Sequence, residues 1–336
     1  MKRVLVIGGE GYIGTVLCPY LLRQGNSVRS FDALVYGNHS NVIANTAYGS
    51  SYEFVRGDMR VREQVRDAME GVDSVVLLAG LVGDPITKKY PRESASINDD
   101  GVQNVIDLAI ESKVNHIVFV STCSNYGLIP TDNLADENWP TNPLSAYARS
   151  KIAAEQYLLS LGREEGTAIT ILRFATAFGL SPRMRFDLTI SEFVREIYLG
   201  NKLTVYDADT WRPYCHVNDF ARLIHIVLCV EKSSVANQVF NAGGTINNFT
   251  KRMVVDLVIQ RIEDGEVYYQ EHGHDPRNYR VDFSKIEKIL GFRPEYTVEN
   301  GVDELLWALK RQLFDLDSSA ATKYGNYTLN SRFLLP

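Results

Sequence analysis

The sequence of 336 residues has no paired cysteines, because Cys18, Cys123, Cys215 and Cys229 lie far apart and form no CxxC motif. This spacing argues against a structural zinc site and is typical of reduced thiols in a cytosol. The run His-Gly-His-Asp at 272–275 lacks further ligands at supporting spacing. We therefore expect a loop there and no metal.

Long apolar runs and an excess of positive charge are also absent. No run approaches the length of a membrane span, and the net charge of −6 argues against general nucleic-acid binding. A strand is expected from residue 3 onward, which leaves no room for a signal peptide. We therefore predict a soluble cytoplasmic protein with neither a membrane nor a nucleic-acid partner.

What the sequence does contain is an ordinary globular composition with alternating strands and helices in its first half. Apolar residues make up 45% of the chain and charged residues 23%, and its length exceeds that of one typical domain. Strands alternating with helices predict an α/β fold, a Rossmann-type doubly wound parallel sheet. The strands are expected at residues 3–7, 27–31, 53–56, 74–78, 116–120 and 168–173.

A glycine-rich turn follows the first of these strands, with Gly8, Gly11 and Gly14 in GxxGxxG spacing and Gly9 in addition. A helical pattern begins directly after it. Glycines there permit a tight turn and a close approach of the backbone to a pyrophosphate, which the helix N-terminus attracts. The sequence therefore predicts a dinucleotide site.

Further candidates fall at the carboxyl ends of other strands, where ligands of such sheets bind. Asp32 is placed to accept hydrogen bonds from the adenosine ribose and to repel a 2′-phosphate, which favours NAD over NADP. Asp58 either contacts the adenine or caps a helix at 61–69. Small residues at Ala79 and Gly80 let a cofactor lie against the backbone. Thr122 either orients a substrate oxygen or caps its strand.

Tyr147 and Lys151 are four residues apart in a segment, 142–163, that is predicted to be helical. Residues at this spacing share one helix face. A positive charge beside a phenol lowers its pKa toward the range of a working acid or base. The pair is therefore a candidate for proton transfer.

The second half of the chain is less regular and predicts a smaller lobe. A long helix at 92–112 still belongs to the first half. In the second half, helices are expected at 187–199, 217–230, 249–262, 283–290 and 298–313, and short strands at 203–206, 238–241 and 266–270. We divide the chain into an NAD-binding domain (1–175), a substrate-binding lobe that returns strand residues to the first sheet (176–316) and a C-terminal tail (317–336).

Taken in order, these motifs resemble the extended short-chain dehydrogenase/reductases, in particular their nucleotide-sugar epimerase/dehydratase branch. The resemblance extends to the segments Arg173–Gly179, Arg212–Asp219 and Asn241–Gly243. It implies NAD as cofactor, a nucleoside-diphosphate sugar as substrate and a homodimer formed through helices 92–112 and 142–163.

The resemblance also implies site residues. Catalysis is assigned to Thr122, Tyr147 and Lys151. The expected cofactor-binding residues are Gly8, Gly11, Tyr12, Ile13, Gly14, Asp32, Asp58, Met59, Ala79, Gly80, Tyr147, Lys151 and Phe174. The expected substrate-binding residues are Thr122, Cys123, Ser124, Thr176, Arg183, Arg185, Arg212, Asp275 and Arg277, with surface exposure as the alternative for Arg183 and Arg185.

Three departures from the family pattern bear on the reaction. The dehydratases of this branch have an Asp-Glu pair after the catalytic Thr, whereas this sequence has Cys123 and Ser124. Thr176 stands near the place of the family's substrate-binding Asn. The runs at 81–85 and 179–188 resemble a subgroup that acts at C4 of nucleotide-linked heptoses.

We therefore expect hydride transfer at C4 of a nucleotide sugar, by a 4-epimerase. The alternatives are a 4-dehydrogenase of GDP- or ADP-heptose, a 3/5-epimerase with Cys123 as base, and a non-catalytic NAD-binding regulator.

Overall fold

The computed structural model describes residues 2–37, 39–130, 132–161, 166–262, 265–273, 275, 277–316 and 323–335. Its centre is a parallel sheet in which the strands follow the order β3-β2-β1-β4-β5-β6-β10. The chain turns from one half of the sheet to the other between β1 and β4, as in a doubly wound fold. The strands are β1 (Arg3–Ile7), β2 (Ser27–Asp32), β3 (Tyr52–Arg56), β4 (Ser74–Leu77), β5 (His116–Thr122), β6 (Ala168–Phe174) and β10 (Gln238–Ala242).

Helices cover both faces of this sheet, so its strands are apolar on both sides. Val4 and Val6 of β1 belong to a core cluster shared with α1 (Gly14–Arg23) and α9 (Val217–Cys229). Leu5 and Ile7 point the other way. They join α3 (Arg62–Met69), α6 (Val102–Glu111) and α7 (Ala146–Leu161) in a second cluster. The alternation follows from the period of two in a strand.

The remaining helices are short or belong to the second half of the chain. They are α2 (Ser40–Asn45), α4 (Asp84–Lys89), α5 (Pro91–Ala95), α8 (Thr189–Tyr198), α10 (Lys232–Val235), α11 (Lys251–Ile259), α12 (Ser284–Leu290) and α13 (Val298–Lys310). None of the helices within the described residues combines the length and the apolar character needed to cross a membrane.

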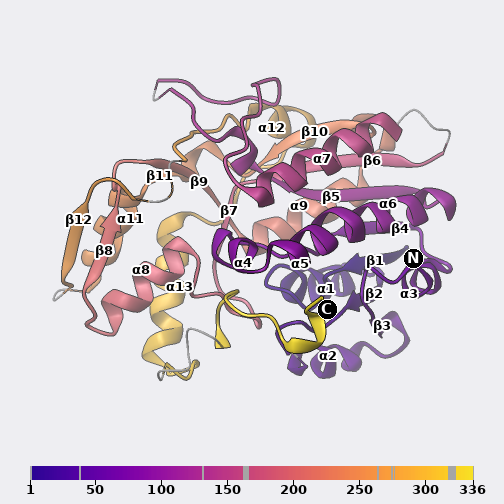
Figure 1. Ribbon diagram of the computed structural model, residues 1–336, viewed down its shortest axis with the longest axis horizontal. Coiled ribbons are helices and arrows are strands. Elements are labelled where there is room, and N and C mark those ends of the chain that lie inside the picture. The colour runs from indigo at the N-terminus through magenta and orange to yellow at the C-terminus, as the bar shows by residue number, and fades with distance from the viewer. Residues whose placement is uncertain are drawn as a thin grey trace.

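The structure also contains two small sheets, and the sequence predicted the strands of only one of them. β8 (Leu203–Tyr206) and β12 (Val267–Gln270) pair with each other as a parallel ribbon. A three-stranded sheet of β7 (Thr176–Phe178), β9 (Trp211–His216) and β11 (Asn248–Thr250) was not predicted. Its strands are short and pair over long sequence distances, which local patterns do not report. In Figure 1, β8, β12, α8, α11 and α13 gather at one end of the molecule, away from the central sheet.

The predicted helix 92–112 has three parts: α5, a π-helical stretch at Ser96–Gly101, and α6. Asn98 lies in the π-helical stretch and is buried. Its side-chain oxygen accepts a 2.7 Å hydrogen bond from the Leu81 N–H, and its amide donates a 3.0 Å bond to the Leu81 carbonyl. The distortion therefore fixes the loop that follows β4.

The helix that carries Tyr147 begins later than the predicted residue 142. A residue before a proline disfavours the helical conformation, which applies to Asn142 before Pro143, and Ser145 lies two residues after that proline. The Ser145 hydroxyl accepts a 3.2 Å hydrogen bond from the Ala148 N–H, as an N-cap does. The helix therefore starts at Ala146. The end of the predicted range, 162–163, lies outside the described residues.

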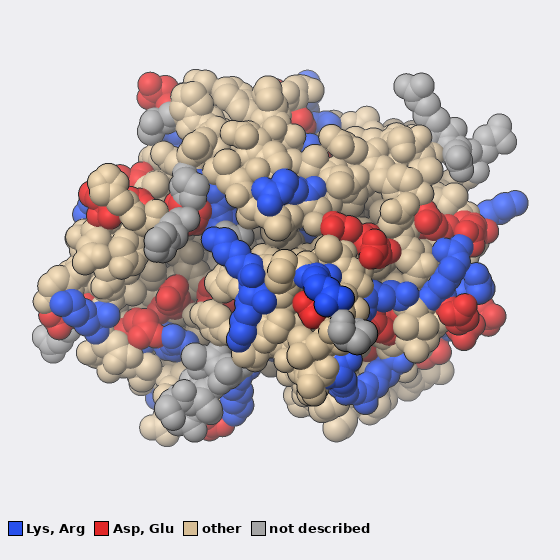
Figure 2. Space-filling view, in the orientation of Figure 1, with Lys and Arg blue, Asp and Glu red and all other residues tan. Residues whose placement is uncertain are grey.

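Lys and Arg side chains are interspersed with Asp and Glu over the face seen in Figure 2.

Candidate active site

A cavity of about 750 Å³ lies beyond the carboxyl ends of the central strands. Every predicted cofactor residue lines it. Of the predicted substrate residues, Thr122, Ser124, Thr176, Arg183, Arg185, Arg212, Asp275 and Arg277 line it as well. Residues from both halves of the chain therefore meet in one site.

The glycine turn after β1 forms a bare backbone wall. Gly8 has a φ of +88°, and a Cβ there would lie 2.8 Å from the Ala79 nitrogen. A Cβ on Gly14 would lie 2.4 Å from the Gly8 carbonyl oxygen. Only glycine fits at these two positions, because any side chain would meet backbone atoms. The wall and the start of α1 suit a pyrophosphate.

Asp32 is held at the end of β2 by two backbone hydrogen bonds, one from the Glu10 N–H (3.0 Å) and one from the Leu34 N–H (2.7 Å). Burial raises the pKa of its carboxyl, and these bonds and Arg183 oppose that shift. A carboxylate fixed here suits the ribose hydroxyls of a dinucleotide.

Asp58 does not cap the helix that follows it. α3 begins at Arg62 with Val61 in the N-cap position, so the capping alternative is wrong. The Asp58 carboxylate instead pairs with Arg60 at 2.7 Å and lines the cavity beside Met59.

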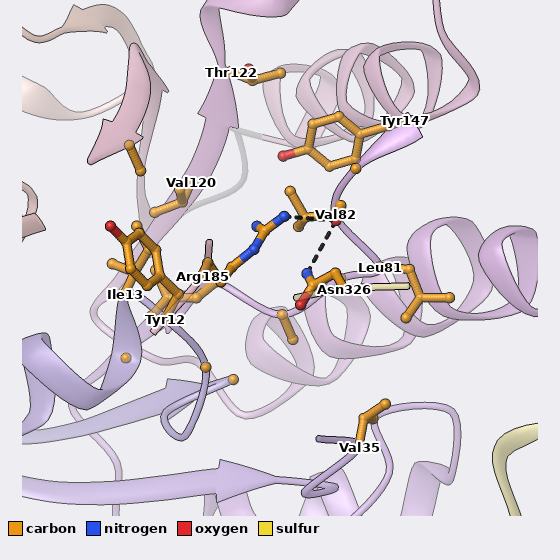
Figure 3. Close-up of a pocket in the computed structure, with 18 of the residues that line it drawn as sticks. Tyr12, Ile13, Val35, Leu81, Val82, Val120, Thr122, Tyr147, Arg185 and Asn326 are labelled. Carbon is orange, nitrogen blue, oxygen red and sulfur yellow. Dashed lines mark hydrogen bonds between the residues drawn. The ribbon is translucent and has the colours of Figure 1, made fainter. Parts of the chain in front are cut away.

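Lys151 is almost fully buried and anchored to β5. Its ammonium donates a 2.8 Å hydrogen bond to the Val120 carbonyl and lies 5.8 Å from the centre of the Tyr147 ring. Burial lowers the pKa of Lys151 to about 8, and Glu155 opposes the shift. Figure 3 shows the Tyr147 hydroxyl directed into the cavity. The arrangement places an ionisable phenol beside an ammonium.

Thr122 ends β5 at the cavity wall. Its hydroxyl oxygen accepts a 3.1 Å hydrogen bond from the Ser124 N–H and so caps the 3₁₀ turn Cys123–Tyr126. The oxygen has capacity for a second hydrogen bond, because a hydroxyl both donates and accepts. The capping and substrate interpretations are therefore compatible.

Cys123 was expected to contact substrate, and its position corrects that expectation. The residue is 1% exposed, belongs to the core and is not among the residues that line the cavity. Its thiol donates to the Arg173 carbonyl, and burial raises its pKa. The 3₁₀ turn after Thr122 directs this side chain inward, so Cys123 is a packing residue.

Two arginines share one carboxylate at the far wall. Arg212 lies 3.0 Å and Arg277 2.7 Å from the oxygens of Asp275. Burial alone would raise the pKa of Asp275, but Arg277 and Arg212 hold it well below its usual range. The group carries a surplus positive charge, which suits a diphosphate.

Arg183 and Arg185 are buried, so the surface alternative is wrong. Arg185 pairs with Asp187 at 2.6 Å and reaches the Val82 carbonyl (Figure 3). Arg183 lies 4.2 Å over the centre of the Tyr36 ring. Both guanidinium groups thus face the cavity from the loop before α8.

Several lining residues carry no recognisable signal in the sequence. Glu10 occupies a variable place in the glycine motif, yet its buried carboxylate accepts hydrogen bonds from Ser30, Asn41 and Tyr52. Asn326, Tyr327 and Phe333 come from the tail, far from any motif. Only the tertiary structure brings such residues to the site.

No group of three or more potential metal ligands occurs among the residues that the structure describes. His274, part of the run predicted to be a loop, lies outside them.

The glycine wall and the fixed Asp32 fit NAD, because they offer the surface and the acceptor that a dinucleotide needs. Together with the Tyr147-Lys151 pair beyond the same sheet edge, they define a dinucleotide-dependent enzyme of the extended short-chain dehydrogenase/reductase class.

Comparison with known proteins gives the family. Residues 4–243 match the NAD dependent epimerase/dehydratase family, and the chain belongs to that family. NAD is therefore its cofactor.

Individual relatives perform more than one reaction. The chain is 27% identical to a UDP-glucose 4-epimerase of Corynebacterium glutamicum over 96% of this chain and 99% of that protein. Its fold is similar to the dTDP-glucose 4,6-dehydratase DesIV of Streptomyces venezuelae solved with NAD (TM-score 0.82, 27% identity, 93% of this chain and 98% of that one). It is also similar to the UDP-glucose 4-epimerase of Thermus thermophilus with NAD (TM-score 0.79, 26% identity, 91% and 100%).

Proposed function

We propose that this protein is a nucleotide-sugar 4-epimerase that oxidises and re-reduces C4 of a nucleoside-diphosphate sugar. The observation that carries the proposal is the convergence of Tyr147, Lys151 and Thr122 in the cavity whose far wall holds Arg212 and Arg277. The first three residues suit proton transfer at a hydroxyl, and the two arginines suit a diphosphate.

When bound, NAD would supply the acceptor for the hydride that leaves C4 and, in its reduced form, the donor of the hydride that returns. Tyr147 as phenolate takes the proton of the C4 hydroxyl, and the charge of Lys151 favours the phenolate. Thr122 hydrogen-bonds the same oxygen and orients it. The resulting 4-keto sugar turns over within the site, and Tyr147 returns the proton to the C4 oxygen as the other face of the ketone is reduced to the inverted alcohol.

Arg212 and Arg277 hold the diphosphate in this proposal, and Asp275 both fixes them and contacts the nucleoside sugar. Guanidinium groups bind phosphate oxygens through two parallel hydrogen bonds. Asp275 is one-third exposed and so remains accessible to a ligand.

Sugar 4,6-dehydration is disfavoured because no carboxylic acid follows Thr122. Of the described residues that line the cavity, the carboxylates are Glu10, Asp32, Asp58, Asp187 and Asp275. Each of them is engaged in hydrogen bonds or ion pairs with other residues, so none is free to remove the C5 proton beside Thr122. The buried thiol of Cys123 likewise disfavours a 3/5-epimerase.

A 4-dehydrogenase of a nucleotide-linked heptose is the second candidate. The runs 81–85 and 179–188 resemble that subgroup, and they touch, because Arg185 donates to the Val82 carbonyl. The same residues perform the oxidation, but the ketone leaves the site.

We further propose that the protein forms a homodimer through α6 and α7. Its molecular mass measured by analytical sedimentation would test this.

The test is a panel of nucleotide sugars, including GDP- and ADP-heptose, followed by absorbance of reduced nicotinamide and by analysis of the sugar. A flat trace with a C4-inverted product supports the epimerase. A sustained rise that tracks sugar consumption replaces it with the dehydrogenase. Solvent deuterium in the sugar ring would instead indicate carbon-acid chemistry.

A further inference from the structure

Residues 323–335, which we call the C-terminal strap, lie across the cofactor end of the cavity. In Figure 1 this yellow segment returns from α13 to the first elements of the chain. Asn326, Tyr327 and Phe333 of the strap line the cavity together with Asp32 and the glycine turn. Asn326 and Phe333 are each only 6% exposed.

Hydrogen bonds attach the strap to both rims of the cavity. On one rim, the Asn326 amide donates to the Val82 carbonyl at 3.1 Å, and the Leu335 N–H donates to the Glu93 carboxylate at 3.2 Å. On the other, the Arg332 guanidinium donates to the Leu34 carbonyl at 3.0 Å. Leu34 follows Asp32 by two residues, so the strap bridges the place where the adenosine ribose is expected.

The loop before α8 is attached to the strap as well. The Phe186 N–H donates to the Tyr324 carbonyl at 2.7 Å, and Arg183 donates to the Gly325 carbonyl at 3.3 Å. Arg183 is therefore enclosed by the strap, by Tyr36 and by the nearby Arg185.

Two buried polar atoms in this enclosure have no hydrogen-bond partner among the described residues. They are the side-chain oxygen of Asn326 and the hydroxyl of Tyr36. Arg183 has no carboxylate of the described chain within ion-pair distance, whereas Arg185 has Asp187. Buried groups of these kinds are normally satisfied, by a ligand if not by protein. The missing partners are a hydrogen-bond donor for Asn326 and an anion for Arg183.

We propose that the C-terminal strap completes the cofactor site, that Asn326, Tyr36 and Arg183 bind the dinucleotide, and that the strap retains it from one turnover to the next. A dinucleotide offers both missing partners, because ribose hydroxyls donate and the pyrophosphate is anionic. Arg183 then binds the cofactor and not the sugar nucleotide. The substrate end, with Thr122 and Arg277, stays outside the strap.

Retention matters for the reaction, because an epimerase needs the reduced cofactor to stay in place until it reduces the ketone. The inference rests on NAD binding and deepens the proposed function. Its test uses no sugar, so its failure is distinguishable from failure of the epimerase assignment.

The test is the exchange of bound NAD. The full-length protein is loaded with radiolabelled NAD, mixed with excess unlabelled NAD, and sampled by gel filtration over time. The double variant Asn326→Ala/Arg332→Ala is expected to release label at least about tenfold faster than the unmodified protein. Leu334→Ala is the matched control, because its side chain is exposed in the same strap, and it should release label at the unmodified rate.

A release rate in the double variant equal to that of the unmodified protein would overturn the retention claim. Thermal unfolding without added NAD shows whether each variant is folded. For Arg183→Met, calorimetry is expected to show at least about tenfold weaker NAD binding with unchanged binding of UDP, dTDP, GDP and ADP. Weaker binding of a nucleoside diphosphate with unchanged NAD binding would assign Arg183 to the substrate instead.

Discussion

The ammonium of Lys151 donates a 2.8 Å hydrogen bond to the carbonyl of Val120, two residues before Thr122 on β5. This bond joins the helix that carries Tyr147 to the strand that carries Thr122. Because both catalytic candidates depend on the same contact, their relative position is set by β5 and α7 and not by a mobile loop.

The first prediction is a loss of activity at alkaline pH. Burial lowers the pKa of Lys151 to about 8, so Lys151 is charged below that pH and neutral above it. The neutral form no longer favours the Tyr147 phenolate, and kcat should fall as the pH rises through about 8. In Lys151→Arg the side chain stays charged, so the fall in kcat should occur at higher pH. If kcat of that variant fell at the same pH as in the unmodified protein, another group would be the one that titrates.

The second prediction concerns Tyr147→Phe, which removes the proton acceptor. Turnover should fall by about 10²–10⁴-fold, the usual contribution of a positioned acid or base, while NAD stays bound. Tyr157→Phe is the matched control on the same helix, because its hydroxyl donates to Asp107 outside the cavity. Comparable rates in the two variants would remove Tyr147 from the mechanism.

The third prediction separates the two ligands. Arg277→Ala should weaken binding of a nucleoside diphosphate by about tenfold to a hundredfold, because it removes charge-assisted hydrogen bonds. NAD binding should not change. Arg293→Ala is the control, since its side chain is 77% exposed and pairs with Glu287. Calorimetry with each ligand measures both effects, and an equal loss of NAD affinity would contradict the assignment.

The fourth prediction concerns stability beneath the site. The Glu155 carboxylate pairs with Arg173 at 2.7 Å, with side chains that are 3% and 9% exposed. Glu155→Ala leaves a buried cation uncompensated and should lower the free energy of unfolding by about 3–5 kcal/mol. Glu111→Ala breaks the exposed pair with Arg62 and should cost less than about 1 kcal/mol. Urea denaturation gives both values, and similar losses would show that the buried pair has no special role.

Much of the fold was predictable because its signals are local. The apolar runs of β1 and β4, the glycines after β1 and the four-residue spacing of Tyr147 and Lys151 each depend on neighbours in sequence. The parallel sheet and the predicted cofactor-binding part of the cavity lining followed from them. Strands β7, β9 and β11 were missed because their pairing is long-range and their runs are short.

The errors in the site have a common physical origin, the direction in which a side chain points. Cys123 stands next to a catalytic candidate, yet the turn after Thr122 sends its thiol into the core. Surface exposure was the alternative for Arg183 and Arg185, and it is wrong because packing of their loop against the strap buries both side chains.

The sequence alone thus determined the family, the cofactor fold and the catalytic pair, because each is encoded by residue types at short, fixed spacing. Only the tertiary structure decided that Asn326 and Arg183 meet near Asp32. Contacts between residues about 140 to 290 positions apart depend on how whole elements pack, and no short-range pattern in the chain specifies that packing.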